Sequence, residues 1–344
     1  MTTNIRARRA GALLGFVLIV LACAPWAAPV GAQRVEETTL AVPALGVSFA
    51  ASFIADELGL WEREQLRVQT SIIPAVGSTN ALLSRSVDFT VGTAASFARV
   101  NTRGQRVVAI MQLMDRLTVE IVLRRDVADK AGVTAAMPVE RRAQALRGRR
   151  IAVDGFNAMP HLVLRYVARK AGIDAERDLT VTPMQPPSML AALKSGAIDG
   201  FAFGMPWTVM AVRDGTAVTL LSTPRGELAE LYPFAFLVIL TRPEVCEAKP
   251  TVCRKLVAGY RRALDTIHER PAAALAALTK RLDKSDPAIL AESFELVRLA
   301  TSRTGRVDEA GLRRGYDFLV EAGVLKPEEK LPPLAALYTN RFVP

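Results

Sequence analysis

The chain has 344 residues, of which 44 are Lys or Arg and 34 are Asp or Glu, so its formal net charge is +10 at pH 7. Half of its residues are hydrophobic, which is enough apolar material for two compact lobes that each have a core. The basic residues are scattered except in two clusters, at residues 141–142 and 147–150, and neither cluster is interleaved with aromatic side chains. We therefore interpret both clusters as solvated surface and expect no nucleic-acid partner.

The first 32 residues have the three parts of a secretory signal. Arg6, Arg8 and Arg9 precede an apolar run over residues 10–22, which has about half of the ~20 residues that a bilayer-spanning helix needs. A stretch of small residues then ends at Ala32. We expect residues 1–32 to be a signal peptide and the protein to be periplasmic. Removing them takes away three arginines and no acid, which lowers the net charge from +10 to +7.

Two processing routes fit this N-terminus. Val30 and Ala32 suit the third-last and last positions of an ordinary signal, with cleavage before Gln33. Residues 20–23, VLAC, also fit the lipobox of bacterial lipoproteins, in which case a lipid at Cys23 would anchor the protein to the membrane. We favour cleavage before Gln33, because the lipobox needs only four permissive residues.

Cleavage there would leave Cys246 and Cys253 as the only cysteines, in an oxidising compartment. Their short separation predicts a disulfide, and the alternative is a pair of buried free thiols. A metal site is less favoured than either, because the two histidines, His161 and His268, are not near these cysteines in sequence. No cofactor is implied.

Residues 37–114 alternate short apolar strands with amphipathic helices, a pattern that predicts parallel strands covered by helices. We expect Ser48 to cap the first helix and Gly59 to end it. The predicted strands are residues 39–42, 67–73, 87–91 and 107–114, and the predicted helices are 49–58, 79–85 and 94–103.

A second set with the same alternation follows a strand at residues 118–123 and an Arg-rich helical insertion at 126–148. Residues 234–240 then form a strand that can cross back, and only helices come after it. One of these helices carries an apolar stripe from Cys253 to Ile267, and Asp286 and Asp308 cap two more. The second set has predicted strands at 150–153, 179–184, 198–203 and 218–221, and predicted helices at 160–171, 188–194 and 206–213.

This order predicts an α/β protein in which one lobe interrupts another. Lobe 1 comprises residues 33–120 and 238–344, with the C-terminal helices, and lobe 2 comprises residues 121–237. The strands at 118–123 and 234–240 would cross between the lobes and act as a hinge about which the cleft opens and closes.

Four segments of the chain form a recognisable set: ADELGLW at residues 55–61, VDFTVGTAASF at 87–97, ALKSGAIDGFAF at 192–203 running into GMPW at 204–207, and YTNRFVP at 338–344. In their order and spacing they resemble the nitrate, sulfonate and taurine class of periplasmic solute-binding proteins. The resemblance covers essentially the whole mature chain. It implies a two-lobed periplasmic-binding type II architecture, with the ligand held in the cleft between the lobes.

In this class Glu is often found before the second-lobe proline, where this chain has Met205. The departure argues against taurine or a similar amino-sulfonate, because Met205 offers no carboxylate to a ligand ammonium.

The residues alone point to the same cleft, since ligands of open α/β sheets lie beyond the carboxyl ends of the strands. Helix N-termini meet there and attract anions. Each candidate has an alternative role that involves no ligand. The small polar residues could be plain helix caps, and the large apolar residues could be part of the core. The candidate ligand-binding residues are Ser48, Phe49, Gly77, Ser78, Thr79, Gly92, Thr93, Ala94, Phe156, Asn157, Met159, Met205 and Trp207.

A lining of Phe49, Phe156, Met159 and Trp207 would suit a ring or an alkyl chain better than nitrate. We expect a small organic anion or aromatic metabolite as ligand, an ABC permease with its ATPase as partner, and a monomer.

The main alternative is an enzyme on the same fold, because the wider family includes pyrimidine-precursor synthases and a desulfinase. His161 is the one residue that could act as a base near the cleft, and we interpret it as structural. An extracytoplasmic sensor would show the same residues as a transport component.

Overall fold

The computed structural model describes residues 35–344, apart from the side chains of residues 75 and 76. The expected signal peptide, the cleavage before Gln33 and the lipid at Cys23 therefore lie outside the described residues. Within the part of the chain that the structure describes, no helix is long and apolar enough to cross a bilayer.

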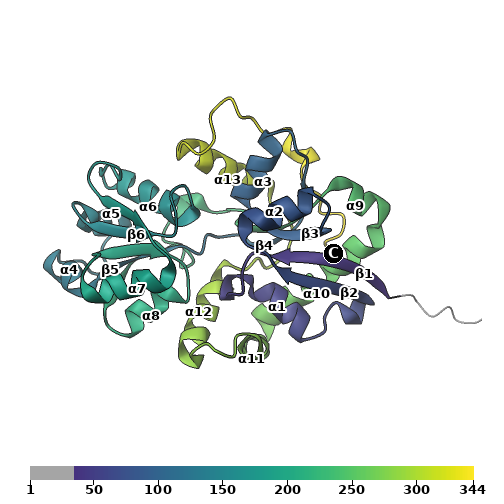
Figure 1. Cartoon of the computed structure of the whole chain (residues 1–344), viewed down its shortest axis with the longest axis horizontal. Helices are drawn as coiled ribbons and strands as arrows, with labels where there is room; N and C mark the ends of the chain where they lie inside the picture. The colour runs from purple at the N-terminus through teal and green to yellow at the C-terminus, as the bar shows by residue number, and fades with distance from the viewer. Residues whose placement is uncertain (1–34) are drawn as a thin grey trace, which may run out of the picture. The chain divides into compact units, whose positions relative to one another are not determined.

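The strands of the described residues lie in two sheets (Figure 1). Each has five strands, in the orders β2-β1-β3-β10-β4 and β7-β6-β8-β5-β9. The strands are β1 (Glu36–Val42), β2 (Leu66–Ile72), β3 (Phe89–Thr93), β4 (Val108–Met114), β5 (Glu120–Arg124), β6 (Arg150–Val153), β7 (Thr180–Pro183), β8 (Gly200–Phe203), β9 (Ala217–Ser222) and β10 (Leu237–Thr241).

Helices pack around both sheets, and the last of them follow β10, as predicted. They are α1 (Ala50–Glu57), α2 (Ala75–Leu83), α3 (Ala94–Thr102), α4 (Arg125–Lys130), α5 (Val139–Ala143), α6 (Met159–Lys170), α7 (Pro186–Ser195), α8 (Trp207–Arg213), α9 (Pro243–Ala248), α10 (Pro250–Glu269), α11 (Pro271–Arg281), α12 (Pro287–Ala300) and α13 (Glu309–Glu321).

Each sheet contains one strand that runs against its neighbours. β1 is parallel to β2 and β3, and β6 is parallel to β7 and β8, as the alternating pattern predicted. However, β10 lies between β3 and β4 and is antiparallel to both, and β5 lies between β8 and β9 in the same way. The expectation of parallel pairing fails for β4 and β9, which are hydrogen-bonded to β10 and β5 and not to the parallel strands. A chain that arrives from the other sheet enters in the opposite direction and lies between them.

The predicted crossings at 118–123 and 234–240 are displaced for the same reason. Most of their residues belong to β5 and β10, which are hydrogen-bonded inside the sheets. The chain passes between the sheets in the residues just before each of these strands, at 115–119 and 223–236.

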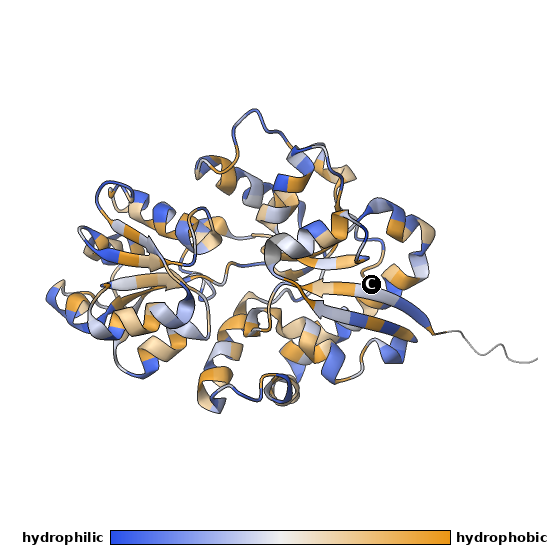
Figure 2. Cartoon of the chain, in the orientation of Figure 1, coloured by the Kyte–Doolittle hydropathy of each residue, from blue (hydrophilic) through white to orange (hydrophobic). Residues whose placement is uncertain are grey.

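The central strands of the first sheet are buried because both faces of the sheet are covered by helices. Side chains alternate along a strand, so Leu40 and Val42 join the core formed with α1, α10, α11 and α12, while Ala41 joins the core under α2 and α3. In β10, Ile239 packs on the first face and Leu240 on the second. Strands covered on both sides read as continuous apolar runs, and the edge strand β2 and the start of β1 are more hydrophilic (Figure 2).

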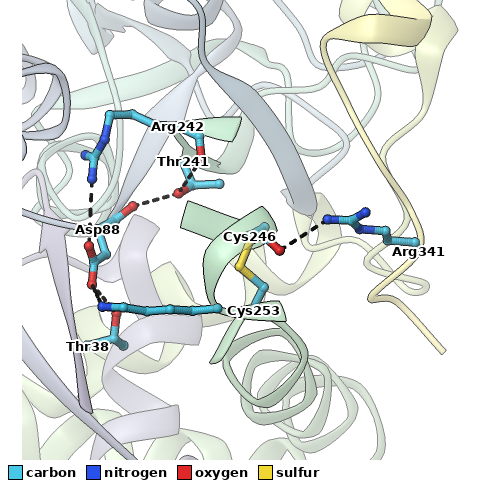
Figure 3. The surroundings of a disulfide bond; sticks show 8 residues. Thr38, Asp88, Thr241, Arg242, Cys246, Cys253 and Arg341 are labelled. Carbon is cyan, nitrogen blue, oxygen red and sulfur yellow. Dashed lines mark hydrogen bonds and ion pairs between the residues drawn. A yellow bond between two sulfur atoms is a disulfide. The ribbon is translucent and has the colours of Figure 1, made fainter. Parts of the chain in front are cut away.

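Helix α10 is held against the first sheet by the predicted apolar stripe, and every residue of that stripe is fully buried. The Cys246–Cys253 disulfide is confirmed and joins α9 to α10, with 5.7 Å between the two Cα atoms. Arg341 of the C-terminal tail donates to the Cys246 carbonyl at 3.3 Å (Figure 3). The tail is therefore part of the first lobe's packing.

Two local predictions near the helix starts are corrected. Ser48 is not the cap of α1, because a 3₁₀ turn at Val47–Phe49 leads into the helix and no side chain caps it. Helix α2 begins at Ala75, four residues before the predicted start at Thr79, so residues 77–79 lie inside the helix. Gly59 does end α1, with a φ of 58°.

Candidate functional site

A cavity of about 620 Å³ lies between the two sheets. Its walls are the segments that follow β1, β6 and β8, together with the end of β3 and residues of both connections between the sheets. The carboxyl ends of parallel strands converge at such an edge, which is where open α/β sheets hold ligands. The segment between α11 and α12 supplies a further wall.

Six of the predicted residues line this cavity: Ser48, Phe49, Thr93, Met159, Met205 and Trp207. Trp207 is the first residue of α8 and is partly buried against the apolar core of the second lobe. Met205 is only 5% exposed and packs with the core of the first lobe. Ser48 belongs to the turn before α1 and lines the cavity without acting as a helix cap.

Further apolar side chains, from Phe203, Met210 and Phe236, complete the walls. The cavity is thus mainly lined by apolar side chains, which are aliphatic, aromatic and thioether groups, with a few polar side chains among them. Such a surface binds a ring or an alkyl body better than a bare inorganic ion.

Gly92 and Thr93 have structural roles in the first lobe. Thr93 caps α3: its hydroxyl accepts from the Ser96 N–H at 3.1 Å, and the Ser96 hydroxyl accepts from the Thr93 N–H at 2.8 Å. A Cβ atom on Gly92 would lie 2.3 Å from Leu240 Cδ1. The absence of a side chain at Gly92 therefore makes room for β10.

The other predicted residues lie outside the cavity lining as the described residues define it. Ala94 packs against α13, where a Cβ on Gly315 would meet it at 2.5 Å. Gly77, Ser78 and Thr79 lie in α2, with Ser78 only 1% exposed. Their contact with a ligand stays a prediction.

Phe156 and Asn157 lie in the loop between β6 and α6, next to the cavity but not in its lining. Asn157 has a φ of 62°, and its N–H donates to Nδ1 of His161 at 3.0 Å. Phe156 packs edge-on against the same imidazole ring. Burial lowers the pKa of His161, which favours the neutral ring that accepts this hydrogen bond. His161 thus holds the loop in shape.

Asp154 begins this loop and lines the cavity. Its Oδ1 atom is buried and has no hydrogen-bond partner among the described residues. Burial raises the pKa of the Asp154 carboxyl, while the backbone N–H groups of Asp154 and Gly155 act in the opposite direction. The second lobe therefore places at the cavity a carboxyl with one unpaired oxygen, so the lack of a carboxylate at Met205 does not by itself argue against a ligand ammonium.

The wall between α11 and α12 was missed by the sequence reasoning. Leu282, Lys284 and Ile289 from this segment line the cavity. Asp286 also lines it, but its Oδ1 accepts from the N–H groups of Ala288 and Ile289, both at 2.9 Å, as the predicted cap of α12. In the sequence, Asp286 predicted where α12 begins but not that the start of this helix lines a cavity.

Among the described residues, no group of three or more His, Cys, Asp or Glu side chains is placed to hold a metal ion. The lining of the cavity, mostly apolar with a few polar side chains, is typical of a site that binds a small organic molecule.

Each sheet contains one antiparallel strand, β5 or β10, that the chain enters from the other sheet. Two such α/β lobes with a cavity between them define the periplasmic-binding-protein fold. The periplasmic aliphatic sulphonate binding protein SsuA from Escherichia coli has the same fold, with a TM-score of 0.68, 17% sequence identity and a match over 88% of this chain and 91% of that one.

The sequence pattern of the NMT1-like family matches residues 31–281, which is well over half of the chain. The chain therefore belongs to the NMT1-like family. The Nitrate/nitrite binding protein NrtA of Nostoc sp. is 27% identical over 136 residues, 40% of this chain and 28% of that protein. The Nitrate import ATP-binding protein NrtC of Synechococcus elongatus is 44% identical over 71 residues, 21% of this chain and 11% of that protein. The chain thus matches only a minor part of either relative's length.

Proposed function

We propose that this protein is the extracytoplasmic solute-binding component of an ABC importer, which captures a small organic anion or an aromatic metabolite without changing it chemically. The observation that carries the proposal is the cavity of about 620 Å³ between the two sheets, which takes its walls from both lobes. A ligand in such a cavity contacts both lobes only when they are closed, so its binding favours the closed form.

The contacts that join the lobes outside the cavity are of two kinds. Phe318 and Leu319 of α13 pack within the apolar core of the second lobe. The polar contacts include the pair of Arg213 in α8 with Glu292 in α12, at 3.1 Å, whose side chains are 47% and 37% exposed. Exposed ion pairs contribute about 0 to 1 kcal/mol, so this pair adds little to the free energy of closure, and a ligand that bridges the lobes can add more.

The names of similar proteins support this role. SsuA is described as an aliphatic sulphonate binding protein, NrtA as a nitrate/nitrite binding protein, and NrtC as the ATP-binding protein of a nitrate importer. By the same logic, the partners of this chain are an ABC permease and its ATPase.

The remaining expectations complete the proposal. Residues 1–32 are the signal peptide of a periplasmic, monomeric protein, with lipidation of Cys23 as the alternative route. Lobe 1 comprises residues 33–120 and 238–344, and lobe 2 comprises 121–237. The hinge then lies at the two connections between the sheets, residues 115–119 and 223–236.

A thermal unfolding screen tests the proposal. The purified protein is heated with sulfonates, carboxylates, aromatic acids or pyrimidines. A ligand at a hundred times its Kd stabilises the native state by about 2.7 kcal/mol, which raises the midpoint by several degrees. Mass spectrometry should then recover the bound compound unchanged. A panel without any shift contradicts ligand capture from these four classes, and a chemically altered ligand contradicts a pure binding role.

A further inference from the structure

The strongest unexplained feature of the cavity is the carboxyl of Asp154. Native proteins pair nearly all buried polar side-chain atoms, so an orphan at a binding cavity needs a cause. Oδ1 of Asp154 is buried and has no partner among the described residues. Asp286, a second carboxylate of the lining, is different because its Oδ1 already accepts two backbone hydrogen bonds.

The cationic and imidazole groups near Asp154 in sequence are committed elsewhere. The guanidinium of Arg150 donates to both carboxylate oxygens of Asp199, at 3.2 and 2.9 Å. Nδ1 of His161 accepts from the backbone N–H of Asn157. These contacts hold the loop that presents Asp154 in shape. The backbone N–H groups of Asp154 and Gly155 also interact with the carboxyl, and its Oδ1 atom remains without a partner among the described residues.

The first lobe contributes a group of opposite charge. Lys284, between α11 and α12, lines the cavity and forms no ion pair or hydrogen bond with any residue that the structure describes. Apolar side chains such as Phe49, Met159 and Trp207 make up much of the remaining lining. A carboxyl from one lobe, an ammonium from the other and an apolar wall define a ligand with complementary ends.

We propose that Asp154 selects ligands that carry a hydrogen-bond-donating amino group, and that the natural ligand is a small amphoteric molecule with an apolar body, its amino group at Asp154 and its acidic group toward Lys284. This inference rests on the proposed function and narrows its ligand class. A nitrate ion or an unsubstituted alkanesulfonate has no donor for Asp154 and would bring a negative charge into a cavity that already holds a carboxyl.

The test uses pairs of compounds that differ only in an amino group. They are para-aminomethylbenzoate and para-toluate, ε-aminocaproate and caproate, and homotaurine and propanesulfonate. Isothermal titration calorimetry measures the affinity of each for the wild-type protein. We expect the amino compound of at least one pair to bind about 10- to 100-fold more tightly than its partner, the range for a hydrogen bond to a charged group.

Asp154→Asn should reduce that preference to within about twofold, because the amide keeps the shape and loses the charge. Asp283→Asn is the matched control, since Asp283 is an exposed neighbour of Lys284 outside the described lining and its replacement changes the net charge equally. Asp154→Ser is a second variant in case the amide disturbs the loop, and thermal unfolding checks that each variant is folded.

The outcomes separate the two proposals. Equal or tighter binding of the amine-free compounds to the wild-type protein would overturn the amino selectivity and leave solute capture standing. A preference for the amino compounds that persists in both Asp154 variants, shown to be folded, would also overturn the role of Asp154. If no compound of any pair binds, solute capture of small organic acids fails, and the selectivity fails with it.

Discussion

Glu120 connects the core of the second lobe to the wall of the cavity. It is 2% exposed at the start of β5. Its Oε2 accepts from the hydroxyl of Thr208 at 2.5 Å, and its Oε1 accepts from that of Ser222 at 2.7 Å. Thr208 follows Trp207 in the first turn of α8. Glu120 thereby helps to position an aromatic wall of the cavity.

Burial raises the pKa of Glu120, and the two hydroxyl donors only partly oppose this. The native state then keeps the proton at pH values where the unfolded chain has lost it, so this group's contribution to stability falls as the pH rises through the raised pKa. A tenfold difference in proton affinity between the native and unfolded states corresponds to about 1.4 kcal/mol. Glu120→Gln removes the charge and retains the shape, and we expect it to be more stable than wild type near about pH 8, with a smaller difference near about pH 5.

Urea unfolding at both pH values measures this effect. Glu120→Ala should instead lose about 2 to 6 kcal/mol, because the hydroxyls of Thr208 and Ser222 are both fully buried and would be left unpaired. Glu328→Gln, an exposed glutamate, is the control and should change little at either pH. If Glu120→Gln is destabilised equally at both pH values, the reasoning from the buried charge is wrong.

The remaining predictions concern the disulfide, a close contact in the first sheet and the cavity wall. Cys246→Ser with Cys253→Ser should lower stability by about 2 kcal/mol, since the bond closes a loop with a sequence separation of 7, and alkylation followed by intact-mass analysis should find both thiols blocked in the native protein. Two thiols freely alkylated under denaturing, non-reducing conditions would contradict this. Gly92→Ala should lower the free energy of unfolding by about 1 to 3 kcal/mol, because its Cβ would overlap the buried Leu240, whereas Gly155→Ala meets nothing within 4 Å and should be close to neutral. Trp207→Ala should weaken ligand binding in titration calorimetry more than Ser78→Ala does, because it removes a large apolar surface from the wall; equal affinities for wild type and both variants would place the site elsewhere.

Helices with an apolar stripe or a capping residue could be predicted from the sequence, because these signals lie within the helix itself. The apolar stripe of α10 follows the period of a helix, and Asp286 and Asp308 accept from the first backbone N–H groups of α12 and α13 as predicted. The position of β5 and β10 was not predictable in this way. Which sheet accepts a strand depends on partners far away in the sequence, and both strands read locally as apolar extended segments.

In the candidate site, too, the residues marked by local sequence were predictable, and those placed by distant parts of the chain were not. Phe49, Met159, Met205 and Trp207 were found because they follow strands whose carboxyl ends meet at one edge. Lys284 was missed because no local signal shows which surface a C-terminal helix pair will cover. From the sequence, Gly92 could belong to an anion site or to a plain helix cap, and only the structure shows its close packing against Leu240.

Small-angle scattering with and without a saturating amount of the tightest-binding panel compound measures whether the two lobes close around an unchanged ligand. A shift from about 1% to 99% closed needs roughly 5.5 kcal/mol of differential affinity, far more than the exposed contact between Arg213 and Glu292 can give. We expect a smaller radius of gyration in the presence of the ligand, with mass spectrometry recovering the compound intact. Identical scattering curves from a protein shown to be saturated would contradict it.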